Sequence, residues 1–333
     1  MFAHRIVDFT GPQAVQWTQL QEPAADDGVV IDVVAAGVSF ADLLQTTGAY
    51  QLKVPLPFTP GMDAAGTVRS ARPELGLAAG QRVAVLLSSG CWQEVISAPA
   101  ERVLALPDDL SLEAAAALPL NYLTGLFAFR RRGRAQAGQT LLVHGAAGGV
   151  GTAAIQLGRA LGLRTIAVVG DQVKRQFAIQ RGADHAVLAG GWLAAVRELV
   201  GDRAVDLVLD PVGGDRMTDS LRSLAPEGRL LVLGFAAGEI PTVKVNRLLL
   251  GNTAVVGVAS REFFDQQPEV VAELWAQLLE LRRTGALADP PVQLFPFADA
   301  RDALGVIAGR QARGKVVLTK RVKAPGHAEQ RPG

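Results

Sequence analysis

Cysteine is nearly absent from this 333-residue chain, which contains Cys91 alone. A single thiol excludes an internal disulfide framework and fits a reducing compartment. Histidine is also scarce, because the chain has only His4, His144, His185 and His327, and their spacing is not that of metal ligands. These absences exclude the commonest sulfur and imidazole metal sites, so we expect no metal, and Cys91 is interpreted as a packed thiol rather than a nucleophile.

Long apolar runs and a strong net charge are missing as well. The N-terminus has no long apolar segment of the kind found in signal peptides, and no run is long and uncharged enough to span a bilayer. The formal net charge is +1, so no electrostatic pull toward nucleic acid or a membrane surface follows. We therefore expect a cytoplasmic protein that binds neither. The length and the 49% hydrophobic content predict about two domains with large cores.

A glycine cluster between an apolar run and a helical pattern is the most informative stretch that is present. Residues 140–143 are apolar and predict a buried strand, Gly148, Gly149 and Gly151 follow, and apolar residues then recur at helical spacing up to Leu161. Strand, glycine turn and helix is the context that a dinucleotide-binding loop requires. The glycines remove side chains where the backbone approaches a pyrophosphate, and the N–H groups of the helix start face its charge. The alternative is a plain structural turn.

The pattern of predicted elements changes near residue 120. The preceding part reads as short strands and turns, whereas strands alternate with helices from about residue 119 to 258. That alternation predicts an α/β fold with a parallel sheet covered on both faces. The predicted strands in this part are 164–169, 205–210, 228–234 and 253–258, and the predicted helices are 173–181, 217–224 and, further on, 269–283.

Five motifs resemble those of the medium-chain dehydrogenase/reductases. They are Gly37-Val-Ser-Phe-Ala-Asp-Leu-Leu, Pro60-Gly-Met-Asp-Ala-Ala-Gly-Thr-Val, His144-Gly-Ala-Ala-Gly-Gly-Val-Gly, Asp210-Pro-Val-Gly-Gly and Gly314-Lys-Val-Val-Leu. The resemblance covers residues 6–318, and the branch it points to is the zinc-free quinone oxidoreductase group, similar to zeta-crystallin. It implies a GroES-like β-rich catalytic domain from residues 1–120 and 260–320, and a Rossmann dinucleotide-binding domain from 121–259. Residues 321–333 are expected to be a flexible tail.

Zinc is excluded at the positions that the resemblance points to. The zinc-dependent relatives have a cysteine where this chain has Ser39, and a His-Glu pair where it has Met62 and Asp63. A hydroxyl and a thioether do not replace thiolate and imidazole as zinc ligands. One cysteine also cannot form the four-cysteine structural zinc loop of those relatives. We therefore expect no metal and no metal-held alkoxide.

The predicted cofactor is NADPH. NAD-binding Rossmann folds usually place a carboxylate at the end of the second strand, but Val169 and Gly170 stand there. Asp171 follows, and we interpret it as a helix N-cap, with ribose binding as the alternative. By resemblance, Lys174 and Arg310 match family residues that contact the 2′-phosphate.

The resemblance also supplies the remaining candidate residues. It implies that Gly148, Gly149, Val150, Thr124, Gly234, Phe235 and Ser39 line the cofactor, with Thr124 beside the reacting ring and Ser39 where relatives usually have an asparagine. Tyr50 matches a tyrosine near the substrate mouth, although a packing role is an equal alternative. Leu44 replaces the family's other active-site tyrosine. Ser39 and Tyr50 are therefore the weak catalytic candidates, and no dedicated acid is expected.

Three functions are consistent with this pattern. The first is hydride transfer from NADPH to a quinone held between the two domains, with the proton coming from solvent. The second is reduction of the double bond of an enone or enoyl thioester, which needs an acid more and is disfavoured by Leu44. The third is an NADPH-binding protein with little catalytic activity. Since the family commonly dimerises through its last Rossmann strand, the apolar 253–258 stretch predicts a homodimer.

Overall fold

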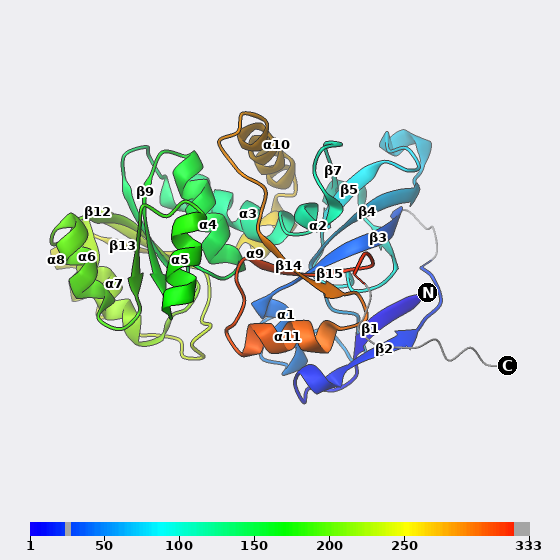
Figure 1. Ribbon diagram of the computed structural model, residues 1–333, viewed down its shortest axis with the longest axis horizontal. Helices are drawn as coiled ribbons and strands as arrows, with labels where there is room; N and C mark the ends of the chain where they lie inside the picture. Colours follow the sequence, from blue (N-terminus) through cyan, green and yellow to red (C-terminus); the bar gives the residue numbers. More distant parts are fainter. Residues whose placement is uncertain (24–27, 323–333) are drawn as a thin grey trace. The chain divides into compact units, whose positions relative to one another are not determined.

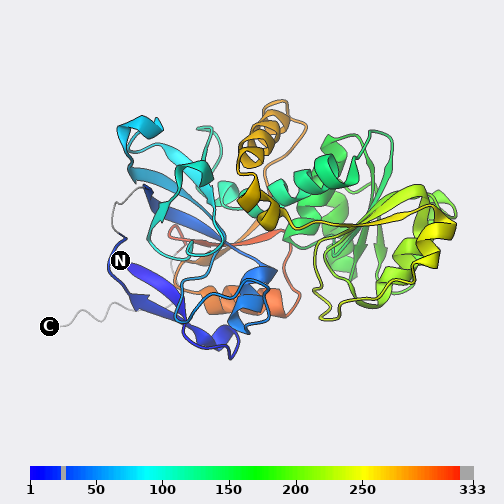
Figure 2. The ribbon, with the colours of Figure 1, turned by 180° about the vertical axis from the view of Figure 1, so that it is seen from behind.

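The computed structural model describes residues 1–23 and 28–322, which form two compact units. The first unit comprises Met1–Pro119 together with the segment that begins at Val292, and the second comprises Leu120–Pro291. The ribbon is shown in Figure 1 and from behind in Figure 2. The predicted tail, 321–333, lies outside the described residues from 323 onward. No helix in the described residues is long and apolar enough to cross a membrane.

The first unit is built around an extended mixed sheet. In the described residues its strands run in the order β14-β15-β3-β4-β5-β7, with β6 paired to β3 and a separate β1-β2 hairpin. The strands are β1 (Phe2–Ile6), β2 (Val15–Gln19), β3 (Val29–Val38), β4 (Asp63–Ser70), β5 (Arg82–Leu86), β6 (Val95–Ala98), β7 (Val103–Ala105), β14 (Val292–Pro296) and β15 (Lys315–Thr319). The helices are α1 (Phe40–Thr46), α2 (Leu112–Ala115) and α11 (Ala300–Ala308).

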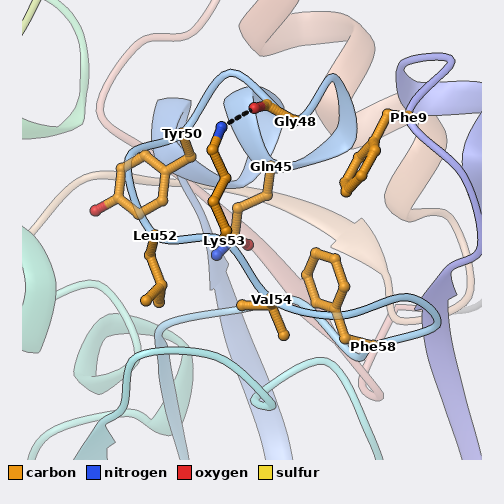
Figure 3. Close-up of a pocket in the computed structure, with 8 residues that line it drawn as sticks. All are labelled: Phe9, Gln45, Gly48, Tyr50, Leu52, Lys53, Val54 and Phe58. Carbon is orange, nitrogen blue, oxygen red and sulfur yellow. Dashed lines mark hydrogen bonds between the residues drawn. The ribbon is translucent and has the colours of Figure 1, made fainter.

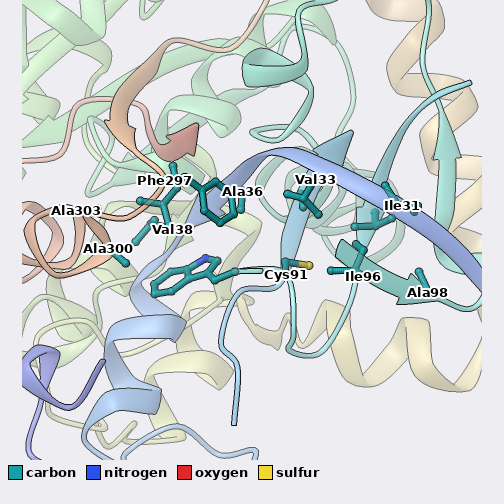
Figure 4. Close-up of a cluster of buried hydrophobic side chains, with 14 of the residues drawn as sticks. Ile31, Val33, Ala36, Val38, Cys91, Ile96, Ala98, Phe297, Ala300 and Ala303 are labelled. Atoms are coloured by element: carbon teal, nitrogen blue, oxygen red, sulfur yellow. The ribbon is translucent and has the colours of Figure 1, made fainter. Parts of the chain in front are cut away.

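The core of this unit joins segments from both ends of the chain. Val38, Cys91, Phe297 and Ala300 belong to one cluster of buried hydrophobic side chains (Figure 4). β15 pairs antiparallel with β3 along Val316–Thr319, which joins the C-terminal segment to the strands from the N-terminal part of the chain. Cys91 is buried in this cluster, which agrees with its interpretation as a packed thiol, and burial raises the pKa of that thiol.

The second unit is the predicted α/β domain, and the fold class is confirmed. In the described residues its sheet has the parallel order β10-β9-β8-β11-β12-β13. In chain order that arrangement is 3-2-1-4-5-6, the doubly wound order of dinucleotide-binding folds. The strands are β8 (Thr140–His144), β9 (Arg164–Val169), β10 (His185–Leu188), β11 (Val205–Asp210), β12 (Leu224–Val232) and β13 (Ala254–Gly257).

Helices cover both faces of the parallel sheet. α4 (Gly149–Ala160) packs on β8 and β9, α5 (Gln172–Gln180) on β9 and β10, and α7 (Met217–Ser223) and α8 (Asn246–Gly251) on β12; α6 (Trp192–Val200) contacts β10 and α7. Strands buried on both faces carry continuous apolar runs rather than alternation, as in the β9 sequence Arg-Thr-Ile-Ala-Val-Val. Gly158 brings α4 close to the sheet, since a Cβ there would lie 2.9 Å from Leu141 Cδ2.

The boundary between the units differs from the expected one over residues 260–291. These residues form α9 (Ser260–Gln266) and α10 (Glu269–Arg283), and they belong to the second unit. The physical reason is packing against α3 (Pro119–Leu126) and the π-helical turn Phe127–Gly133 that continues it. The ring centroid of Phe127 lies 4.8 Å from that of Phe263 and 5.5 Å from that of Phe264. After the second unit, the chain returns to the mixed sheet of the first unit at β14.

Candidate functional site

The glycine loop joins β8 to α4 at the carboxyl edge of the parallel sheet. Gly148 is the N-cap of α4, and the N–H groups of Gly149, Val150 and Gly151 are the first of the helix, without intrahelical acceptors. A Cβ on Gly151 would lie 2.3 Å from the carbonyl oxygen of Gly145. Position 151 therefore has no room for a side chain, and the N–H groups of the loop form the positive end of a 12-residue helix.

The loops after β11 and β12 stand at the same edge of the sheet. β11 is the neighbour of β8 where the strand order reverses, which is the place where such sheets bind ligands. Asp210 ends β11 and accepts the N–H of Val212 at 2.8 Å, and burial raises the pKa of this carboxyl. Ala237 N–H donates to Val212 O at 2.9 Å, so Gly234 and Phe235 lie beside the β11 loop. The Phe235 side chain is exposed there.

Asp171 and Lys174 follow the carboxyl end of β9. Asp171 is the N-cap of α5, as predicted, because its Oδ1 accepts the backbone N–H of Lys174 at 2.8 Å. Its Oδ2 lies 3.4 Å from Lys174 Nζ. These interactions, the backbone hydrogen bond first, lower the pKa of Asp171 below its usual value. A cation and an ionised carboxylate therefore stand side by side at the end of the second strand of the doubly wound order.

Thr124 lies in the second unit on α3, where its hydroxyl is held by α9. Thr124 Oγ1 and Ser260 Oγ are 2.8 Å apart, and either hydroxyl can be the donor. Asn121, one turn earlier on α3, approaches the glycine loop so closely that a Cβ on Gly149 would lie 2.4 Å from its Nδ2. α3 thus connects the glycine loop to α9, and sequence patterns missed both Asn121 and Ser260 because nothing local marks them.

Ser39 lies in the first unit and is the N-cap of α1. Its Oγ accepts the N–H of Asp42 at 3.3 Å, and its own N–H donates to Asp42 Oδ2 at 2.8 Å, which forms a capping box. The Ser39 hydroxyl also donates to Asp42 Oδ2 at 2.5 Å. The other Asp42 oxygen accepts the N–H of Gly61 at 3.1 Å. Burial raises the pKa of Asp42 to about 6, while Ser39 and Lys315 oppose that rise. The hydroxyl hydrogen of Ser39 is thus already donated, so Ser39 is not poised to donate to a substrate oxygen.

Tyr50 lines a small pocket in the first unit, shown in Figure 3. The other lining residues are Phe9, Gln45, Gly48, Leu52, Lys53, Val54 and Phe58. Tyr50 follows α1, and its N–H donates to the carbonyl oxygen of Leu44 at 3.3 Å. The catalytic assignment of Tyr50 stays a prediction.

The positions that correspond to zinc ligands hold groups that do not fit a zinc ion. Met62 is buried, and Asp63 forms a buried ion pair with Lys315, whose ammonium repels a cation. Ser39 is engaged with Asp42 as described. In the described part of the chain, no group of three or more His, Cys, Asp or Glu side chains could hold a metal ion.

Arg310 is placed in the first unit, whereas Lys174 belongs to the second. It follows α11 with φ +54°, a left-handed backbone that an arginine seldom adopts. Its predicted contact with a 2′-phosphate stays a prediction.

The second unit defines a protein class, because a 3-2-1-4-5-6 sheet with a glycine loop at its switch point is a Rossmann dinucleotide-binding domain. Family models agree: residues 25–108 match an alcohol dehydrogenase GroES-like domain, and residues 149–278 match a domain described as zinc-binding dehydrogenase. The second description is that of the wider family. In this chain, the residues at the positions of the zinc ligands do not fit a zinc ion.

Three known proteins show the relationship. Rat quinone oxidoreductase-like protein 2 is 36% identical over 301 residues, which is 89% of this chain and 86% of that protein. Human synaptic vesicle membrane protein VAT-1 homolog is 31% identical over 316 residues, covering 89% and 80%. The Thermus thermophilus quinone oxidoreductase, solved alone and with NADPH, is 35% identical with a TM-score of 0.81, covering 96% of this chain and all of that one (100%). The chain therefore belongs to the quinone oxidoreductase branch of the medium-chain dehydrogenase/reductase family, a family of oxidoreductases.

Proposed function

We propose that this protein is an NADPH-dependent oxidoreductase that transfers hydride to quinones or related conjugated carbonyls without zinc. The observation that carries the proposal is the glycine loop at the switch point, together with Lys174 in the first turn of α5, the helix that follows the neighbouring strand β9. The T. thermophilus relative, which has been solved in complex with NADPH, supports the choice of cofactor. The absence of room for a Cβ on Gly151 supports backbone binding of a pyrophosphate.

The second unit supplies the groups that would hold the cofactor. The N–H groups of Gly149, Val150 and Gly151 would receive the pyrophosphate, and Lys174 would attract the 2′-phosphate. Thr124 would contact the cofactor near its reacting ring, and Ser260 fixes the position of the Thr124 hydroxyl at 2.8 Å. Gly234 and Phe235, at the carboxyl end of β12, would border the same site.

The chemistry of a quinone suits the residues of the first unit. When bound, the nicotinamide supplies a hydride, and the quinone that takes it up becomes a stabilised phenolate-type anion. Such an anion needs no general acid, because solvent protonates it. The Ser39 hydroxyl, already donated to Asp42, gives no ready proton donor, and Leu44 offers none. An enoyl thioester needs a proton on carbon, so these residues favour the quinone.

Oxidation of NADPH across a panel of acceptors tests the proposal. The panel contains simple quinones, enones and enoyl thioesters, and NADPH loss is followed by stopped-flow absorbance against heat-inactivated protein. We expect the highest kcat/KM with quinones. Higher kcat/KM with enones or enoyl thioesters would establish the double-bond reductase instead. Tight NADPH binding without turnover of any acceptor would favour a binding protein instead.

A further inference from the structure

The pair Asp171 and Lys174 brings opposite charges to one position in the second unit. Asp171 Oδ2 lies 3.4 Å from Lys174 Nζ, which is longer than the 2.7–2.9 Å of a strong charge-assisted bond. The Lys174 side chain is 19% exposed and the Asp171 side chain 51%. Asp171 Oδ1 is committed to the cap of α5, so Oδ2 is the oxygen that a ligand reaches.

The position of this pair in the fold indicates which part of a dinucleotide each charge would contact. Asp171 follows Gly151 by 20 residues and stands just beyond β9, the second strand of the doubly wound order. In dinucleotide-binding folds a carboxylate about 20 residues beyond the glycine motif accepts the ribose 2′-hydroxyl of NAD, and a nearby cation accommodates the 2′-phosphate of NADP. This chain presents both groups, three residues apart on one helical turn.

The two charges act in opposite directions on the two cofactors. A 2′-phosphate carries close to two negative charges at neutral pH, so Lys174 attracts it and the Asp171 carboxylate repels it. A 2′-hydroxyl donates to Asp171 Oδ2 and leaves the ion pair with Lys174 in place. The repulsion from Asp171 thus offsets part of the attraction that Lys174 exerts on a 2′-phosphate.

We infer that the Asp171–Lys174 pair makes this protein use NADH as well as NADPH, with Asp171 as the residue that limits the preference for NADPH. The inference rests on the proposed function only for the location of the dinucleotide. Asp171 then acts in cofactor specificity as well as in capping α5, and Lys174 binds either the 2′-phosphate or the neighbouring Asp171 carboxylate.

Dissociation constants for NADPH and NADH, measured by titration calorimetry, test the inference without any acceptor. We expect the wild-type constants to lie within about tenfold of each other, a difference of about 1.4 kcal/mol. Asp171→Ser keeps a capping oxygen and removes the charge, so it is expected to raise the preference for NADPH at least tenfold. Asp171→Asn is a second capping variant that should act in the same direction. Lys174→Met should shift the preference toward NADH.

A matched control variant and two fragments of the cofactors complete the experiment. Asp202→Asn removes a carboxylate from another exposed ion pair of the same unit, with Arg197 at 2.8 Å, and should change neither constant. Adenosine 2′,5′-bisphosphate and AMP report on the adenosine end alone, and Asp171→Ser should tighten only the bisphosphate.

A wild-type preference for either cofactor above about tenfold overturns the inference, as does an unchanged preference in both Asp171 variants. Failure of the wild-type protein to bind either dinucleotide overturns both this inference and the proposed function. Binding with the expected preferences but no turnover of any acceptor overturns the proposed function alone.

Discussion

Lys315 Nζ lies 3.0 and 2.9 Å from the two carboxylate oxygens of Asp63, and both side chains are buried. The residues belong to β15 and β4, which flank β3 on either side in the sheet. The ion pair passes over Gly37 of β3, where a Cβ would lie 2.1 Å from Asp63 Oδ1. The glycine in the Gly37 motif is thus explained by an ion pair that ties the C-terminal segment to the front of the chain.

The buried ion pair predicts a large and asymmetric mutational effect. Lys315→Met leaves the Asp63 carboxylate buried without its cation, which is expected to lower the free energy of unfolding by about 3–5 kcal/mol. Asp63→Leu combined with Lys315→Met removes both charges and should recover most of that loss. Urea denaturation measures the difference. Equal losses in the single and the double variant would contradict the prediction. As a surface control, Arg283→Ala, which breaks the exposed pair with Glu280, should leave the urea midpoint nearly unchanged.

His4 predicts a loss of stability in mild acid. Burial lowers the pKa of His4 from 6.5 to about 4, although the carbonyl of Phe297, 2.7 Å from Nε2, opposes the shift and Arg301 adds to it. The unfolded chain therefore binds the proton first as the pH falls below 6.5, so the stability contribution is present above that pH and is lost between 6.5 and 4.

The His4→Gln variant isolates this effect, because Asp42, whose pKa is raised from 3.8 to about 6, acts in the opposite direction over part of the same range. Relative to the variant, the wild type should lose about 2 kcal/mol of unfolding free energy between pH 7.5 and pH 5.0, at about 1.4 kcal/mol per pH unit below 6.5. Urea curves at both pH values give the difference. A constant gap between the two proteins would show that His4 is not the acid-sensitive group.

The geometry of the glycine loop predicts that a substitution of Gly151 weakens the binding of NADPH. Alanine there would place a Cβ 2.3 Å from Gly145 O, so the loop must move away from the arrangement that presents its N–H groups. Gly151→Ala is expected to weaken NADPH binding at least tenfold in titration calorimetry, about 1.4 kcal/mol. Gly190→Ala is the control, because no atom lies within 4 Å of its added Cβ. Unchanged affinity in Gly151→Ala would argue against backbone binding of the pyrophosphate.

The edge of the parallel sheet predicts a homodimer. In the described residues β13 ends the strand order, and the preceding α8 exposes Leu249 and Leu250 at 76% each. Exposed apolar side chains beside a sheet edge are typical of protein interfaces. Light scattering should therefore give twice the 35.0 kDa chain mass. Leu249→Glu with Leu250→Glu should give monomers, and Leu199→Glu on α6 should not. A monomeric wild type would overturn the prediction.

Local patterns were sufficient for much of the second unit. The predicted strands 164–169 and 205–210 and the predicted helix 269–283 have the observed bounds, because each is a periodic or β-branched run between glycine, proline or capping residues. Asp171 is the N-cap that its residue type predicted. α6, β14 and α11 were not predicted, although α6 is an amphipathic segment between Gly191 and Gly201, and α11 is one between Asp299 and Gly309.

The sequence by itself determined the glycine loop, the parallel α/β unit and the residue types that do not fit zinc, because each depends on a short stretch of chain. The tertiary structure decided which distant groups meet: Lys315 with Asp63 across 252 positions, Thr124 with Ser260 across 136, and residues 260–291 with the second unit. It also decided that the Ser39 hydroxyl donates a hydrogen bond to Asp42. A hydrogen bond or ion pair of this kind depends on the direction of two side chains in space, and neither side chain leaves a mark on the sequence around the other.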